Sequence, residues 1–160
     1  MTELILNYFK GLPETWIVII LAAMPVSELR GAIPVGIIMG LAPITVFGLA
    51  ILGNLLPVMP LLYLLDPVSR KLRKFKLWKN FFDWLFARTK KRAGIIEKYE
   101  LLGLIILVAI PLPMTGAWTG CIAASLFGLN KQKSFFAVAI GVFIAGVIVS
   151  LLTLGAKGLF

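Results

Sequence analysis

Three long stretches without any charge constrain this chain more than any other feature. Residues 31–65, 101–130 and 134–156 contain no acidic or basic side chain. Each stretch is longer than the roughly 20 residues that a helix needs to cross the hydrocarbon core of a bilayer. Hydrophobic residues make up 60% of the 160-residue chain, which is more apolar surface than a soluble core of this size can bury. The sequence therefore predicts an all-α membrane protein with a single membrane domain over residues 1–160.

Each half of the chain contains an apolar segment that is only half as long as a membrane-spanning helix. The first covers residues 15–24 and is interrupted by Pro25; as a helix of ten residues it would rise about 15 Å. The second covers residues 101–110 and is interrupted by Pro111 and Pro113. Another short apolar segment follows each interruption. We therefore expect a re-entrant helical hairpin in each half.

One longer apolar segment follows each hairpin and is expected to cross the membrane. These segments are residues 44–65, which Pro57 and Pro60 should kink, and residues 134–156. The predicted boundaries are 14–65 for repeat one, 66–100 for a basic linker and 101–157 for repeat two.

The two halves resemble each other in sequence. A shift of 86 positions aligns five residues of the first half with identical residues of the second: Ile19, Ile20, Leu21, Ala23 and Pro25 with Ile105, Ile106, Leu107, Ala109 and Pro111. With small gaps, Gly31 and Ala32 align with Gly116 and Ala117, and Gly53 aligns with Gly141. A hairpin plus one crossing changes the side of the membrane once, so the two repeats would be inverted. The hairpin tips, marked by Pro25, Pro34, Pro111 and Pro113, would then face one another inside the protein.

Charge predicts which side of the membrane the linker occupies. Residues 66–100 contain eleven Lys or Arg and four acidic residues, which indicates a cytoplasmic location in the cell membrane. Residues 75–86 separate into an aromatic and a cationic face, as in an amphipathic interfacial linker helix. We expect the basic residues of 70–92 to contact anionic lipid headgroups. A rival topology with four full crossings would place Lys131 and Lys133 outside the cell, so the inverted arrangement is favoured.

The chain lacks the residues that several functional classes need. The chain has no histidine, and Cys121 is its only cysteine, so it offers no His-based catalysis, no internal disulfide and no cysteine metal cluster. We expect no enzyme activity, no metal and no cofactor. The net charge of +9 is concentrated in the linker, which does not indicate nucleic acid binding.

Glu28 and Arg30 are the first candidates for a functional site. They lie next to the first proline break, between apolar segments, where ionisable residues often mark function. Two residues apart, they would not face each other on a regular helix, so a broken tip would be needed to bring them together. They could instead be solvated at an interface, or form a structural ion pair that fixes the tip.

The second tip offers a neutral surface to a substrate. Its candidate substrate-binding residues are Gly116, Trp118, and the hydroxyls of Thr115 and Thr119. The returning helices would point their N-termini toward an anion held between the tips, together with Arg30. Protonation of a buried Glu28 carboxyl would make it the proton-coupling residue. We interpret Asn54, in the first crossing, as a polar contact that supports helix packing.

Four motifs resemble one family of prokaryotic membrane proteins, the small multidrug export family. They are SELRGAIP at 27–34, GNLLP at 53–57, EKY at 97–99 and IPLPMTGAWTG at 110–120. More distantly, the chain resembles the DedA superfamily, which implies paired re-entrant hairpins and, for some members, transport of undecaprenyl phosphate. The acid before a proline in the first DedA hairpin resembles Glu28 and Pro34. DedA proteins usually carry arginine in the second hairpin, which this chain lacks.

The sequence leaves three functional hypotheses. The first is a proton-coupled transporter that moves an amphipathic anion, such as a polyprenyl phosphate, by alternating access. The second is an exporter of small cationic compounds with Glu28 as the binding charge. The third is a membrane scaffold without transport activity. Two full crossings can hardly enclose a cavity, so we expect a homodimer.

Overall fold

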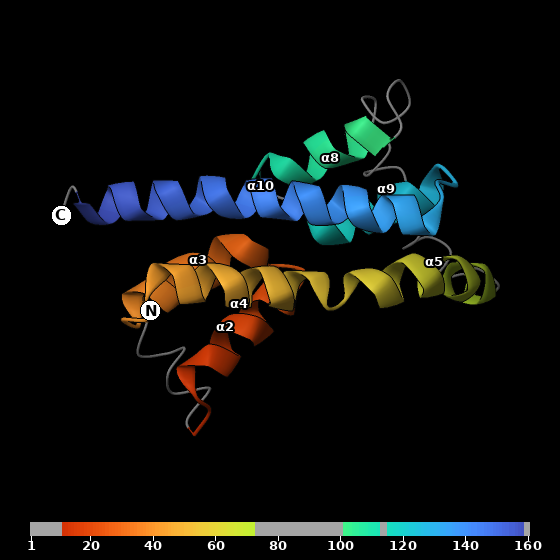
Figure 1. Cartoon of the computed structure of the whole chain (residues 1–160). Coiled ribbons are helices and arrows are strands. Elements are labelled where there is room, and N and C mark those ends of the chain that lie inside the picture. Colours follow the sequence, from red (N-terminus) through yellow and green to blue (C-terminus); the bar gives the residue numbers. More distant parts are fainter. Residues whose placement is uncertain (1–10, 73–100, 113–114, 159–160) are drawn as a thin grey trace. The chain divides into compact units, whose positions relative to one another are not determined.

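The computed structural model of this chain describes residues 11–72, 101–112 and 115–158. All regular secondary structure in these ranges is α-helical, which confirms the predicted all-α class. The helices, labelled in Figure 1, are α2 (Glu14–Ala23), α3 (Glu28–Ile38), α4 (Pro43–Leu55), α5 (Val58–Leu72), α8 (Leu101–Ala109), α9 (Ala117–Leu126) and α10 (Lys131–Gly158). Pro113 and the predicted interfacial helix at 75–86 lie outside the described residues.

Four of these helices have the half-membrane length that the proline breaks predict. Helices α2, α3, α8 and α9 contain 10, 11, 9 and 10 residues, so each rises by about 15 Å and is too short to cross a bilayer alone. In the turn after α3, Gly40 has a φ of +91°, and α4 begins at Pro43. Pro34, expected at a hairpin tip, instead lies inside α3.

Two helical stretches are long and apolar enough to cross a membrane, Pro43–Leu65 and Lys131–Ala156. The first contains α4 and the start of α5, with an interruption at Leu56 and Pro57. This break lies where Pro57 was expected to disturb the helix. Pro60 falls in the first turn of α5, where a helix tolerates proline because those N–H groups have no helical partner. Helix α5 continues to Leu72, beyond the predicted start of the linker.

The described residues form two compact units. One contains those of Met1–Leu56 together with those of Ala145–Phe160, and the other contains those of Pro57–Ile144. Each unit therefore holds one hairpin and a part of α10.

In the first unit, α4 packs against both arms of the hairpin formed by α2 and α3, drawn in red to orange in Figure 1. The helices approach closely because glycine leaves room for them. A Cβ at Gly36 would lie 2.8–2.9 Å from side-chain carbons of Val18 and Val46. A Cβ at Gly53 would lie 2.5 Å from the carbonyl oxygen of Ile19 and 2.9 Å from Cβ of Ala22. The last turn of α4 thus lies directly on the last turns of α2.

In the second unit, α9 packs against α8 and α5. A Cβ at Gly120 would lie 2.6 Å from a methyl group of Val108, which places α9 directly on α8. Helix α10 meets α8 in the same way: a Cβ at Gly141 would lie 2.7 Å from Cβ of Val108 and 3.0 Å from the carbonyl oxygen of Ile105. The buried thiol of Cys121 lies 3.8 Å from the carbonyl oxygen of Val58, at the contact between α9 and α5.

Candidate functional site

The first hairpin tip is a short turn held by two hydrogen bonds to the end of α2. The backbone N–H of Glu28 donates to the carbonyl oxygen of Met24 over 3.1 Å, and the hydroxyl of Ser27 donates to the carbonyl oxygen of Leu21. Helices end with carbonyl groups that lack a helical partner, so these bonds satisfy groups that would be costly inside a membrane. Val26, at the outermost point of the turn, is 94% exposed.

Glu28 has a strained backbone. Its φ is +45°, and it is the only non-glycine residue with a positive φ in the part of the chain that the structure describes. A left-handed conformation costs an L-residue other than Asn or Asp about 1–2 kcal/mol. Strain of this kind is often found at binding and catalytic sites, where the surrounding structure holds the residue in place. The strain thus marks Glu28 as a residue whose orientation is fixed by its neighbours.

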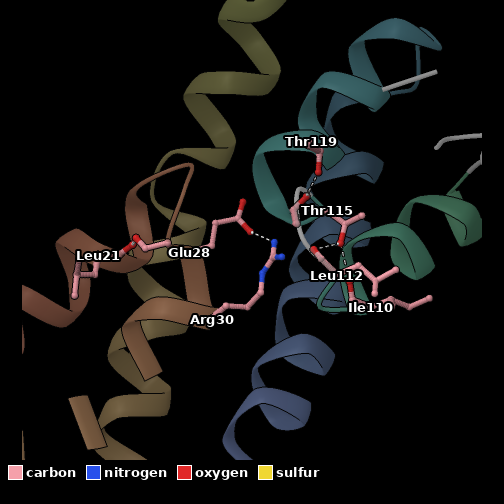
Figure 2. Close-up of polar contacts among 9 residues, drawn as sticks. Leu21, Glu28, Arg30, Ile110, Leu112, Thr115 and Thr119 are labelled. Atoms are coloured by element: carbon pink, nitrogen blue, oxygen red, sulfur yellow. Dashed lines mark hydrogen bonds and ion pairs between the residues drawn. The ribbon is translucent and has the colours of Figure 1, made fainter. Parts of the chain in front are cut away.

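The strained turn allows Glu28 and Arg30 to form an ion pair. Nη2 of Arg30 lies 3.3 Å from Oε2 of Glu28, as Figure 2 shows. The Arg30 side chain is 28% exposed and the Glu28 side chain 7%. Residues two apart do not meet on a regular helix, so the positive φ at the first residue of α3 is what brings these groups together. The guanidinium is therefore the more accessible charge of the pair.

The second hairpin tip is held by two threonine hydroxyls. Oγ1 of Thr115 lies 2.8 Å from the carbonyl oxygens of both Ile110 and Leu112, and its single proton can be donated to only one of them at a time. Oγ1 of Thr119 donates to the carbonyl oxygen of Gly116 over 3.1 Å (Figure 2). Because the hydroxyl protons are used in these bonds, both threonines would meet a ligand mainly as hydrogen-bond acceptors.

Gly116 precedes α9 with a φ of +149° and a ψ of −162°. This region of backbone space is essentially restricted to glycine. Thr115 and Gly116 are buried, whereas Trp118 and Thr119 are half-buried. Two of the four predicted residues of the second tip, Thr115 and Gly116, thus lie directly before α9, and the other two lie in its first turn.

Replacing Thr115 with valine is expected to destabilise the second tip. Valine has a similar shape but no hydroxyl, so the carbonyls of Ile110 and Leu112 would lose their contact with it. Both carbonyls also accept a backbone N–H, from Leu112 and from Thr115, so the variant loses one net hydrogen bond, which is worth about 0.5–1.5 kcal/mol. The thermal unfolding midpoint of the purified variant in detergent should fall by a few degrees. Thr119→Val is the matched comparison: its hydroxyl bonds a single carbonyl from a more exposed position, and an equal or larger fall there would contradict the argument.

Two polar residues of the structure were not predicted as part of a site. Ser27 fixes the first tip through its hydroxyl, and Asn54 is 1% exposed with an Oδ1 atom that has no hydrogen-bond partner among the described residues. The position of Ser27 directly before α3 is typical of a helix N-cap and could have singled it out. The sequence offers no signal for the unsatisfied oxygen of Asn54, because its surroundings come from tertiary packing.

The described residues contain no group of three His, Cys, Asp or Glu side chains able to hold a metal ion. The two tips belong to different compact units. That the two tips together form one substrate site therefore stays a prediction.

A comparison with models of known protein families gives a match to this chain. The family model described as "Putative small multi-drug export protein" matches residues 28–148, which is most of the chain. The chain belongs to this family. The match begins at Glu28, so both Glu28 and Arg30 lie within the matched residues. No curated protein and no solved structure shows a significant match to the chain. Together with the two long apolar helices, the family indicates a membrane protein of a transport family.

Proposed function

We propose that this protein is a secondary membrane transporter that exports a small amphipathic compound, and that the tip carrying Glu28 and Arg30 binds the charged group of that compound. The observation that carries the proposal is a partly buried ion pair on a strained turn between two apolar helices. Ionisable groups in such surroundings are costly and often belong to transport pathways. The family description supports export as the direction.

The proposed mechanism is alternating access between two inverted repeats with re-entrant hairpins. The short length of α2, α3, α8 and α9 supports re-entrant hairpins, because none could cross a bilayer alone.

Matching glycine contacts in the two units support the repeat. Gly53 lies against Ile19 and Ala22 in the first unit, and Gly141 lies against Ile105 and Val108 in the second. These positions are the ones that the sequence alignment of the two halves pairs. Discontinuous helices from such repeats commonly surround the substrate of a transporter.

Two observations differ in the substrate charge that they favour: one favours an anion and the other a cation. Arg30 is the more exposed member of the ion pair, which favours an anionic group such as the phosphate of a polyprenyl lipid. The family description favours small drug-like compounds, which in the cationic case would bind to the Glu28 carboxylate. In either case Glu28 is the proposed proton-coupling residue, because proton uptake would release Arg30 from the ion pair.

Transport by reconstituted protein would decide between the two charges. Purified protein would be placed in proteoliposomes with a pH gradient, and flux would be measured for a cationic dye and for a fluorescent phosphate lipid. An anion transporter should lose at least tenfold in flux with Arg30→Ala, since the guanidinium would contribute directly to binding. A cation exporter should lose as much with Glu28→Gln. Proton coupling predicts that Glu28→Gln makes any remaining flux independent of the pH gradient.

Two exposed charges in other parts of the chain provide matched controls. Glu14→Gln removes an exposed carboxylate at the start of α2, and Lys133→Ala removes an exposed cation in the first turn of α10. Both variants should keep the wild-type flux. If neither substrate crosses with the wild-type protein, or if the controls lose as much as the tip variants, the proposed role of the tip is wrong.

Three further features belong to this proposal. The active form is a homodimer, the protein sits in the cell membrane with its basic linker in the cytoplasm, and residues 70–92 contact anionic lipid headgroups. The excess of basic residues in the linker supports this orientation.

A further inference from the structure

Asn54 is a deeply buried polar residue whose role is unexplained by the proposed function. It lies in the last turn of α4, is 1% exposed, and its Oδ1 atom has no hydrogen-bond partner among the described residues. A buried acceptor without a partner costs about 1–3 kcal/mol in a soluble protein. Inside a bilayer, lipid offers no hydrogen bond in compensation.

The backbone next to Asn54 provides further oxygen atoms that lack a helical donor. The N–H groups that would bond the carbonyls of Gly53 and Leu56 in a regular helix belong to positions 57 and 60, and both positions are proline. Helix α4 ends at Leu55, so the freed carbonyls lie at the break in the first spanning stretch. Residues 53–56, the oxygen-rich segment, thus contain a buried amide oxygen and two carbonyl oxygens that lack a helical donor.

The packing of Gly53 locates this segment within the first unit. Gly53 lies against Ile19 and Ala22, in the last turns of α2. Asn54 therefore lies beside the end of α2, from which the turn to Glu28 begins. The oxygen-rich segment and the charged tip therefore belong to the same compact unit.

We propose that the break between α4 and α5 binds a small monovalent cation, with Oδ1 of Asn54 and the carbonyl oxygens of Gly53 and Leu56 as ligands. Hard cations bind oxygen ligands, and unwound carbonyls in broken transmembrane helices commonly coordinate such ions. The three ligands are neutral, which suits a monovalent ion better than Ca²⁺ or Mg²⁺, whose sites usually include carboxylates. A single ion satisfies three acceptors at once, whereas a water molecule can donate only two protons.

Thermal unfolding of the full-length protein in detergent tests this site without any assay of transport. The midpoint would be compared in sodium, lithium, potassium and choline chloride at one ionic strength. An ion that binds only the folded state stabilises it in proportion to the logarithm of its concentration once the site is saturated. Sodium at ten or more times its dissociation constant should raise the midpoint by about 2–6 °C relative to choline.

Three variants should change this response: two should weaken it and one should strengthen it. Asn54→Leu keeps the side-chain size but removes the oxygen, so the difference between sodium and choline should vanish. Asn54→Asp adds a negative charge to the same place and should make the response appear at a lower sodium concentration. Pro57→Ala restores an N–H donor to the carbonyl of Gly53 and should weaken the response without touching Asn54.

Ser150→Ala is the matched control. The hydroxyl oxygen of Ser150 is also buried without a partner among the described residues, but it lies on α10, which has no proline break. This variant should respond to sodium like the wild type. Equal midpoints of the wild type in all four salts would overturn the proposal, as would a sodium response that survives in Asn54→Leu. Because the readout is ion binding, either result is independent of whether the protein transports a drug or a lipid.

Discussion

A Gly53→Ala variant should lose about 10 °C in the midpoint of thermal unfolding, or fail to yield folded protein. The added methyl group would lie 2.5 Å from the carbonyl oxygen of Ile19, well inside van der Waals contact. The obstacle is backbone, so it cannot move aside as the end of a flexible side chain could. The variant would force α4 away from α2 along the whole contact. Size-exclusion chromatography and thermal unfolding in detergent would measure the effect.

Gly48→Ala is the control on the same helix. A Cβ at Gly48 meets no atom within 4 Å, so this variant should unfold at the wild-type temperature or slightly above. Gly141→Ala should behave like Gly53→Ala, because its Cβ would lie 2.7 Å from Cβ of Val108. Wild-type stability of Gly53→Ala would show that α4 and α2 do not pack as closely as described.

The second large effect is expected from Gly116→Ala in the second tip. The change does not add bulk alone: an alanine cannot adopt a φ of +149° with a ψ of −162° without strain of about 1–3 kcal/mol. The turn that places Thr115 and Thr119 would have to rearrange. We expect a fall of about 4–8 °C in the unfolding midpoint and loss of transport together.

Gly128→Ala provides a graded comparison for this prediction. Gly128 has a φ of +64°, in the left-handed region that an L-residue enters at a lower cost, and a Cβ there would meet no atom within 4 Å. Its midpoint should fall less than that of Gly116→Ala, with transport kept. A larger fall in the midpoint for Gly128→Ala than for Gly116→Ala would argue against a glycine-specific backbone conformation at Gly116.

Local sequence signals predicted the helices well. The length of the apolar segments and the position of Pro25 and Pro111 located the short helices, because proline cannot continue a helix and a bilayer fixes the length needed to cross it. Pro34 misled the prediction. A proline inside α3 removes one helical hydrogen bond, and the packing of α3 against α2 and α4 retains the helix around it.

The details of the candidate site depend on contacts that no short motif encodes. Glu28 has no intrinsic preference for a positive φ; the turn that imposes it is held by Ser27 and by the end of α2. The ion pair with Arg30 follows from that turn. Similarly, the unsatisfied oxygen of Asn54 arises where α4 is packed against α2, which no sequence period indicates.

The buried position of Cys121 makes the natural chain suitable for thiol chemistry. Alkylating reagents attack an accessible thiolate, and the Cys121 side chain is fully buried at the contact of α9 with α5. As the chain has no other cysteine, a cysteine introduced at Val26 would be its only accessible thiol. The outermost residue of the charged tip can therefore carry a spectroscopic label or a cross-linker without removing any native residue from the core.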